Sequence, residues 1–508
     1  MKNNLNSAAF AIWLLIVCIS GQLFAQRPVR MGPASPEEIT KARKYVVANF
    51  DSLKAHKAFI YAMGLGTTQV ADQYRAWIKE YPNKVVIPLS IGTAYYNAEM
   101  PQAREFLLKV ADLEPKNAKI WSMLSGDAFT RGQKDLSTEY KRKAMLAEPS
   151  NASYALEYLT SFDDGDPDVY KQKAFDFIRR FPADENGAYV LYWLAERATD
   201  INDKINYFEE LRKLYPPQKY NWSASGMTGL ADAYLQTDPE KALKLANEMD
   251  GNGDWKLRKQ VAESLIQVNK LEQTQNYREA VSTLDRVILP KLNHLDDFIT
   301  LKKAVLRDNA GDVKAAYDSL ATKFAKTPTD QIYTALNLYG GKMGKIEQQV
   351  VKDIETIRAN TAVAAYPFDL GLYTSTGKLN LKDLKGKVVL LTFWFPACSP
   401  CRAEFPHFQA VIDKLKNKDV VYVGINVFPE QDPYVLPIMK NTKYSFIPLR
   451  GTREFAKKSY GVDSEPENFL IDKDGKIVFK GFRIDNTNHR TLELMISSLL
   501  HNDQHAGN

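Results

Sequence analysis

The sequence predicts a multidomain chain in which an all-α solenoid of repeated helix pairs precedes a smaller C-terminal α/β domain. Three observations support this prediction. Prolines recur at intervals of 33 or 34 residues in the first half, the composition changes near residue 366, and an almost wholly apolar run occupies 388–395. A chain of 508 residues is also too long for a single hydrophobic core. We therefore expect two or more domains.

The composition and charge argue against some classes of function. The chain is 45% hydrophobic and 25% charged, which is ordinary for a globular protein. Its formal net charge of +6 is small for this length, and the sequence has no dense basic block. These values give no support to nucleic-acid binding, so we expect no nucleic-acid partner.

The N-terminus has the three zones of a secretory signal peptide. Lys2 precedes an apolar segment at 8–19, and residues 20–25 end in Ala25, after which cleavage is expected. An uncleaved membrane anchor is the alternative, but the apolar run is short for a spanning helix. We therefore predict a signal peptide at 1–25 and an exported protein, with membrane anchoring only if the signal stays uncleaved.

From 35 to 344 the pattern is helical, and its main feature is a repeat. An aromatic or acidic residue followed by proline recurs in steps of 33, 34, 33 and 34 residues, at Pro82, Pro115, Pro149, Pro182 and Pro216. Before these prolines, small and large apolar residues occur at helical spacing, as in Ala103, Leu107 and Val110. Small residues let paired helices approach closely, and proline ends the second helix of each pair.

This order of small residue, large residue and proline, with a period of 34, resembles the tetratricopeptide repeat. The resemblance covers about 40–220 well and 221–344 loosely, and Arg142 departs from it because the family's second helix is apolar at that position. It implies a solenoid of helix pairs with a concave surface. Two interpretations stay open, a structural spacer and a docking surface for a partner protein, and we favour the second.

After a charged linker at 345–365, the pattern changes to strands that alternate with helices. We expect a hairpin at 366–381, strands at 388–395, 420–428, 468–471 and 476–479, and helices at 401–416, 433–443, before 461 and at 489–500. This order predicts a compact α/β sheet with both faces covered, over 366–500. A polar tail follows at 501–508.

The candidate chemistry lies where the apolar strand ends. Cys398-Ser-Pro-Cys401 follows after a short turn, and a helical pattern begins at once, so the first sulfur lies at a helix N-terminus that favours its thiolate. The other cysteine, Cys18, leaves with the signal. Because one bridge over four residues contributes only about 2 kcal/mol to stability, disulfide exchange explains the pair better. A zinc site would need two further ligands, so we expect no metal.

The C-terminal region resembles the thioredoxin-fold thiol–disulfide oxidoreductases of the TlpA/ResA type, which are exported to the bacterial periplasm. The matching pieces span about 135 residues: 386–394, which ends in Trp394; 398–406, which holds the dithiol; and 460–472, which contains Pro466. The resemblance implies protein disulfides as substrates and an upstream thiol reductant that reduces the enzyme's disulfide back to the dithiol. It implies no cofactor beyond the redox-active disulfide itself.

The same resemblance assigns roles to single residues. Cys398 would be the attacking thiolate and Cys401 the buried resolving one. Glu404, one helical turn beyond Cys401, would shuttle a proton, since the position that carries a buried acid in thioredoxin is a threonine here. Pro466 would follow a cis peptide bond that faces the dithiol, and Glu465 and Trp394 would contribute to the substrate side of the site. A solvated glutamate and a plain turn proline are the simpler interpretations.

Two departures from this family bear on function. Ala397 stands before the first cysteine, where tryptophan is usual, so part of the apolar floor for substrate is missing. Two carboxylates, Glu465 and Glu467, flank Pro466 and should disfavour the thiolate of Cys398. A destabilised thiolate is typical of a reductant, so we predict a reductase of envelope proteins.

Two alternatives remain. A peroxiredoxin has a similar fold, but it needs a threonine three positions before its cysteine, and that position is Phe395. A repeat scaffold or redox sensor with little turnover is the non-enzymatic alternative, because the helical region is longer than the α/β domain.

Overall fold

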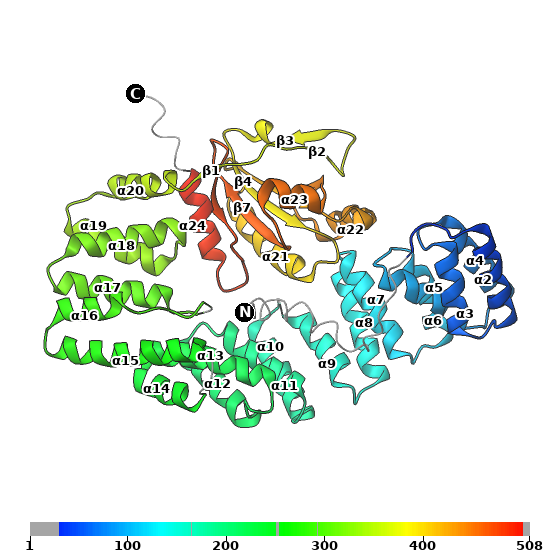
Figure 1. Ribbon diagram of the computed structural model, residues 1–508, viewed down its shortest axis with the longest axis horizontal. Helices are drawn as coiled ribbons and strands as arrows, with labels where there is room; N and C mark the ends of the chain where they lie inside the picture. Colours follow the sequence, from blue (N-terminus) through cyan, green and yellow to red (C-terminus); the bar gives the residue numbers. More distant parts are fainter. Residues whose placement is uncertain (1–29, 164, 250–252, 292, 501–508) are drawn as a thin grey trace, which may run out of the picture. The chain divides into compact units, whose positions relative to one another are not determined.

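The computed structural model describes residues 30–163, 165–249, 253–291 and 293–500 (Figure 1). The predicted signal peptide at 1–25 and the polar tail at 501–508 lie outside these ranges. Contacts divide the chain into two compact units, one that ends at Asp127 and one that begins at Ala128, and each is described by itself. Among the residues that the structure describes, no helix combines the length and apolar character that crossing a bilayer requires.

The first unit is built from helices. They are α2 Pro36–Ala48, α3 Leu53–Met63, α4 Thr68–Glu80, α5 Val86–Asn97, α6 Ala103–Leu113 and most of α7 Ala118–Thr130. The chain enters α2 through a capping box, in which Ser35 and Glu38 each bond the other's backbone N–H. Helices α5 and α6 approach closely at Gly92, where an added Cβ would lie 3.1 Å from the Cβ of Phe106.

The second unit continues with helices before its sheet. They are α8 Lys134–Ala147, α9 Ala152–Leu159, the 3₁₀ turn η2 Thr160–Phe162, α10 Pro167–Arg180, α11 Glu185–Arg197, α12 Ile201–Leu214, α13 Asn221–Thr237, α14 Pro239–Glu248, α15 Gly253–Gln273, α16 Tyr277–Asp285, α17 Asp296–Asn309, α18 Val313–Lys326, α19 Asp330–Lys342 and α20 Glu347–Ala359. Successive helices pack against each other, as in α11/α12, α14/α15 and α17/α18.

The recurring prolines end helices as the sequence predicts. Helices α4, α6, α8, α10 and α12 each end two residues before one of the five prolines. Proline cannot donate the next helical hydrogen bond, and its ring clashes with the preceding turn. The predicted all-α region of packed helices is therefore confirmed, while its assignment to the tetratricopeptide family stays a prediction.

The C-terminal part of the second unit is a six-stranded mixed sheet with the strand order β1-β8-β7-β4-β5-β6 (Figure 1). Its strands are β1 Val363–Ala364, β4 Val388–Trp394, β5 Val420–Asn426, β6 Ile447–Arg450, β7 Glu467–Ile471 and β8 Lys476–Lys480. β4, β5 and β6 are parallel, whereas β7 pairs antiparallel with both β4 and β8. β2 Asp369–Gly371 and β3 Lys378–Asn380 form the predicted hairpin, which η3 Leu381–Leu384 follows.

Helices cover both faces of this sheet. Alternate residues of β4 enter two hydrophobic clusters, with Leu390 in one and Leu391 in the other. The first cluster packs against α21 Ser399–Lys414, α22 Asp432–Thr442 and α24 His489–Leu500, and the second against α23 Arg453–Tyr460. The 3₁₀ turn η4 Pro429–Gln431 leads into α22. The predicted α/β domain with a strand buried on both faces is confirmed.

The structure adds two features to the predicted element order. Strand β6 contains Pro448 at the sheet edge, where the missing N–H of proline is tolerated. The interval predicted as a linker, 345–365, contains the helix expected at 345–358, which is α20, and it also ends in strand β1, which pairs with β8. The sheet therefore begins before residue 366.

Within the second unit, the α-helical region contacts the sheet domain, and two of these contacts are made by arginines of helices α21 and α24. Arg402 of α21 donates to the carbonyl of Thr130 at 3.0 Å, and its guanidinium lies 5.1 Å from the ring centre of Phe129. In the second contact, Arg490 of α24 pairs with Asp330 at 3.0 Å. The first contact involves the residue directly after Cys401.

Candidate functional site

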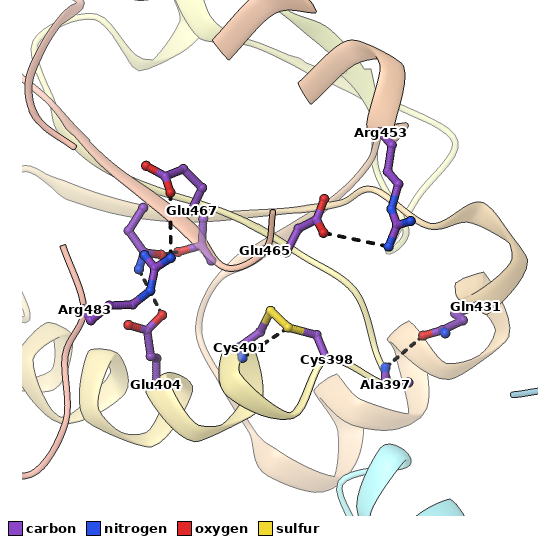
Figure 2. The surroundings of a disulfide bond; sticks show 11 residues. Ala397, Cys398, Cys401, Glu404, Gln431, Arg453, Glu465, Glu467 and Arg483 are labelled. Carbon is purple, nitrogen blue, oxygen red and sulfur yellow. Dashed lines mark hydrogen bonds and ion pairs between the residues drawn. A yellow bond between two sulfur atoms is a disulfide. The ribbon is translucent and has the colours of Figure 1, made fainter. Parts of the chain in front are cut away.

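Strand β4 and helix α21 together position the two cysteines. All seven residues of β4 are buried, and α21 begins at Ser399 with Cys398 as its N-cap. Cys398 and Cys401 form a disulfide with their Cα atoms 5.3 Å apart (Figure 2). The Sγ of Cys398 accepts a hydrogen bond from the backbone N–H of Cys401 at 3.2 Å. The predicted placement of the first sulfur at a helix N-terminus, where positive partial charge favours a thiolate, is confirmed.

The two sulfurs differ in access. Cys398 is 3% exposed and lies beside the exposed Ser399, whereas Cys401 is completely buried. An attacking thiolate from another protein can therefore approach Cys398 but not Cys401. The turn before Cys398 is held in place because the N–H of Ala397 donates to Oε1 of the buried Gln431 at 2.8 Å.

Pro466 follows a cis peptide bond, in agreement with what the family resemblance implies, and directly precedes β7. The preceding Glu465 lies in the surroundings of the disulfide (Figure 2). Its carboxylate pairs with Arg453 of α23 at 3.9 Å, and its side chain is only 10% exposed. The Arg453 guanidinium also lies 5.6 Å and 5.0 Å from the ring centres of Phe395 and Phe428.

The second flanking acid is also paired. Glu467 lies 3.7 Å from Arg483, and burial raises the pKa of its carboxyl against the opposing effect of that arginine. The sequence predicts two unopposed carboxylates that destabilise the Cys398 thiolate. The structure instead gives each of Glu465 and Glu467 a cationic partner, which offsets much of their field.

Glu404 is a buried acid one helical turn beyond Cys401. Its side chain is 5% exposed, Oε2 accepts from Nδ2 of Asn468 at 2.9 Å, and Oε1 accepts from the N–H of Ile484 at 3.0 Å. Burial raises the pKa of Glu404 to about 7, although both donors and the nearby Arg483 favour the charged form. A carboxyl that titrates near neutrality is suited to accept and return a proton.

Trp394 is not at the surface that a substrate would meet. Its side chain is completely buried, and its ring packs edge-on against Phe405 at 5.1 Å and Phe446 at 5.4 Å. Because Trp394 is the last residue of a strand buried on both faces, it supports α21 from inside the core. This corrects its prediction as a substrate-binding residue.

Four site residues were missed by sequence reasoning: Gln431, Arg453, Asn468 and Arg483. Gln431 is 34 positions from its partner Ala397 and Asn468 is 64 positions from Glu404, so neither pair follows from a local pattern, whereas Arg453 and Arg483 lie closer to the acids that they pair with. The sequence offered one signal for the two arginines: Arg453 precedes and Arg483 follows the segment that holds Glu465 and Glu467.

Comparison with known proteins places this site in context. Residues 364–480 match the model of the AhpC/TSA family. Thiol-disulfide oxidoreductase ResA of Bacillus subtilis (strain 168) is 35% identical over 105 residues, which cover 21% of this chain and 58% of that protein. ResA of Bacillus thuringiensis subsp. konkukian is 38% identical over 101 residues, or 20% of this chain and 58% of the relative. The chain thus spans less than two thirds of the length of these relatives.

Two solved structures are similar to the same region. A thiol:disulfide interchange protein of the thioredoxin family from Chlorobium tepidum is 23% identical, with 27% of this chain and 97% of that chain covered and a TM-score of 0.25. The thioredoxin domain of a thiol-disulfide oxidoreductase from Bacteroides vulgatus is 26% identical, with 26% and 96% covered and a TM-score of 0.24. From the sheet order, the dithiol and the sequence matches together, residues 364–480 form a thioredoxin-like domain similar to the AhpC/TSA family and to ResA.

Proposed function

We propose that the protein is a thiol–disulfide oxidoreductase that reduces disulfides of other proteins in the bacterial cell envelope through Cys398 and Cys401. The observation that carries this proposal is the disulfide at the start of α21, in which Cys398 is the N-cap beside the exposed Ser399, while Cys401 is fully buried one helical turn before the acid Glu404. The ResA relatives, named thiol-disulfide oxidoreductases, support the same chemistry.

The reaction proceeds in two exchanges. The Cys398 thiolate attacks one sulfur of a substrate disulfide, which forms a mixed disulfide and releases one substrate thiolate. Cys401 then loses its proton to the Glu404 carboxylate and attacks the Cys398 sulfur. The Cys398–Cys401 disulfide forms, the second substrate thiolate leaves, and the two thiolates take up protons. Two electrons pass from the enzyme to the substrate, and an upstream thiol reductant restores the dithiol.

The reducing direction is supported by the acid near the dithiol. A Glu404 carboxylate one turn from Cys401 disfavours a thiolate there, and a strong oxidant needs a stabilised thiolate in its reduced form. Because Arg453 and Arg483 offset Glu465 and Glu467, Glu404 carries this effect more than the flanking acids do. We expect a reduction potential nearer to the about −270 mV of thioredoxin than to the about −120 mV of strong oxidants.

Location and partners belong to the same proposal. The predicted signal peptide supports export to the periplasm or envelope, and the packed helix pairs offer a surface on which a partner protein can dock. No cofactor beyond the disulfide is needed, since the electrons enter and leave through thiols.

The test is reduction of insulin disulfides by the full chain with dithiothreitol as electron donor. We expect turnover that Cys398→Ser and Cys401→Ser abolish, and a Cys401→Ala variant that retains envelope proteins as mixed disulfides on Cys398. Equilibration with glutathione measures the potential. An inactive full chain would favour a scaffold or redox sensor instead, and a potential near that of strong oxidants would reverse the direction.

A peroxide assay separates the remaining enzymatic alternative. The residue three positions before Cys398 is Phe395, which packs against Phe428 with ring centres 5.8 Å apart and carries no hydroxyl. We expect no consumption of hydrogen peroxide beyond that of free dithiothreitol. Catalytic consumption that Cys398→Ser removes would contradict the proposed exchange activity.

A further inference from the structure

Asn468 of β7 is completely buried, and its side-chain amide makes three hydrogen bonds. Nδ2 donates to Oε2 of Glu404 at 2.9 Å and to the carbonyl of Phe482 at 2.9 Å, while Oδ1 accepts from the Thr392 hydroxyl at 2.9 Å. An asparagine amide has two N–H donors, and both are used here. One of them serves Glu404.

The orientation of this amide is determined by the Phe482 carbonyl. A backbone carbonyl can only accept, so Nδ2 has to face it, whereas the Thr392 hydroxyl can donate or accept and adapts to whichever atom it meets. The Phe482 carbonyl also accepts from Nη1 of Arg483 at 3.1 Å, but a flipped amide would set Oδ1 of Asn468 against that carbonyl oxygen and against the Glu404 carboxylate, with no proton between acceptors. Asn468 presents an N–H donor to Glu404 at all times.

Glu404 receives a donor on each oxygen, from Asn468 and from the Ile484 backbone. Hydrogen bonds of this kind favour the charged form of a carboxyl and oppose the effect of burial. The other charged groups that act on Glu404 are Arg483, which favours its charged form, and Asp485, which disfavours it. The buried Tyr422 of β5 also interacts with it. Asn468 is the donor that comes from a side chain and can be removed by substitution.

We propose that Asn468 is a positioning residue for the proton relay: held by Phe482, it directs one N–H at Glu404 and keeps that carboxyl available as a base at neutral pH. This inference rests on the proposed function, because it assigns Glu404 a proton to carry. Without the Asn468 donor, burial would dominate, and Glu404 would hold its proton to a higher pH.

The experiment measures the pH dependence of kcat/KM for insulin reduction by the full chain. We expect a rising limb near pH 7 in the unmodified protein. In Asn468→Leu, which removes the donor with little change in size, the limb moves up by about one pH unit. Activity then falls about fivefold at pH 7 and returns to the unmodified level near pH 9. A purely structural defect would lower activity at every pH.

Thr392→Val is the matched control. It also removes one buried hydrogen bond from the same amide, but the Phe482 carbonyl still orients Nδ2 towards Glu404. Its pH limb stays in place even if its stability falls. An equal shift in Thr392→Val and Asn468→Leu would overturn the proposed specific role of the Asn468 donor. Should Asn468→Leu fail to fold, Asn468→Val, which suits a strand, replaces it.

Glu404→Gln distinguishes a failure of the proposed proton relay from a failure of the proposed role of Asn468. If it leaves the limb unchanged, the proposed relay through Glu404 fails. The role of Asn468 is then tested by infrared spectroscopy of the Glu404 carboxyl, whose band is identified because it is absent in Glu404→Gln. In Asn468→Leu this band should titrate at a higher pH than in the unmodified protein. If Glu404→Gln removes the limb but Asn468→Leu moves neither the limb nor the band, the relay stands and the role of Asn468 is wrong.

Discussion

Arg453 and Glu465 show how single charges are balanced around the dithiol. Glu465 is nearly buried, whereas the Arg453 side chain is 59% exposed, and it covers the rings of Phe395 and Phe428. Ala397 removes the usual tryptophan next to the first cysteine, and this arginine and the two phenylalanines supply apolar and cationic surface nearby. The negative charge of Glu465, beside Pro466, is therefore opposed by Arg453, which reaches it from helix α23.

Substitution of Arg453 tests this balance. In Arg453→Ala the Glu465 carboxylate loses its partner, so we expect the pH midpoint of Cys398 alkylation by iodoacetamide to rise. Lys457→Ala, on the same helix and paired with Asp463, is the control and should leave the midpoint in place. An unchanged midpoint in Arg453→Ala would show that Glu465 exerts no field on the thiolate.

Glu404 also makes stability depend on pH. Burial raises its folded pKa to about 7 from 4.5, so the folded protein keeps a proton that the unfolded chain loses between these values. The stability linked to this proton is present below about pH 4.5 and is lost as the pH rises towards 7. In the unmodified protein, this contribution to the free energy of unfolding falls by up to about 3 kcal/mol between pH 4.5 and pH 8. We expect Glu404→Gln not to show this fall, because the amide does not titrate.

Urea unfolding of the oxidised protein at both pH values measures this difference. Glu430→Gln, an exposed acid in the same domain, serves as the control and should follow the unmodified protein. A Glu404→Gln variant with the same pH dependence as the unmodified chain would contradict the raised pKa.

Helix α21 is anchored at its first turn by more than the sheet below it. Arg402, directly after Cys401, is 6% exposed, and burial lowers its pKa to about 10. Its guanidinium donates to the Thr130 carbonyl and lies against Phe129. The element that carries the dithiol therefore contacts Phe129 and Thr130, near the start of the second unit, through a buried cation.

We expect Arg402→Ala to lower the free energy of unfolding by about 2 kcal/mol, because the side chain leaves a cavity and its hydrogen bond to the Thr130 carbonyl is lost. Arg402→Met should recover most of this loss, since an apolar chain of similar length fills the space without burying a charge. Denaturant unfolding compares both with Lys440→Ala, an exposed residue of α22. Equal losses in the alanine and methionine variants would show that the charge itself is stabilising.

At the scale of the second unit, Arg358 of α20 joins the α-helical region to the sheet. Its Nε donates to the Ala325 carbonyl at 3.1 Å, and its guanidinium lies 4.8 Å from the ring centre of Phe479 in β8. Leu494 of α24 packs against the hydrophobic cluster of α18 to α20. The two parts of this unit share buried contacts, which favours a common unfolding transition.

Substitution of Arg358 tests this coupling. We expect Arg358→Ala to lower the thermal midpoint measured by near-ultraviolet circular dichroism and the midpoint measured by helix content together. Lys352→Ala, exposed on the same helix, is the control and should change neither. A shift in helix content alone would mean that the sheet domain unfolds independently of α20.

Local features of the fold were accessible from the sequence, and long-range ones were not. The ends of α4, α6, α8, α10 and α12 follow from prolines, which act on their own helical turn. The dithiol and the start of α21 follow from the junction of an apolar strand with a helical pattern. Strand β6 was missed because four residues with a proline show no alternation.

The sequence by itself determined most of the order of helices and strands and the placement of Cys398 at a helix N-terminus, because these depend on neighbouring residues, whereas the cis bond before Pro466 was implied by the family resemblance. Only the tertiary structure decided that Trp394 is buried, that Arg453 and Arg483 offset the acids, and that Asn468 holds Glu404. These partners come from different elements, and Asn468 and Glu404 lie 64 positions apart in sequence. The register of β7 on β4 and the packing of α21 against the sheet bring them together.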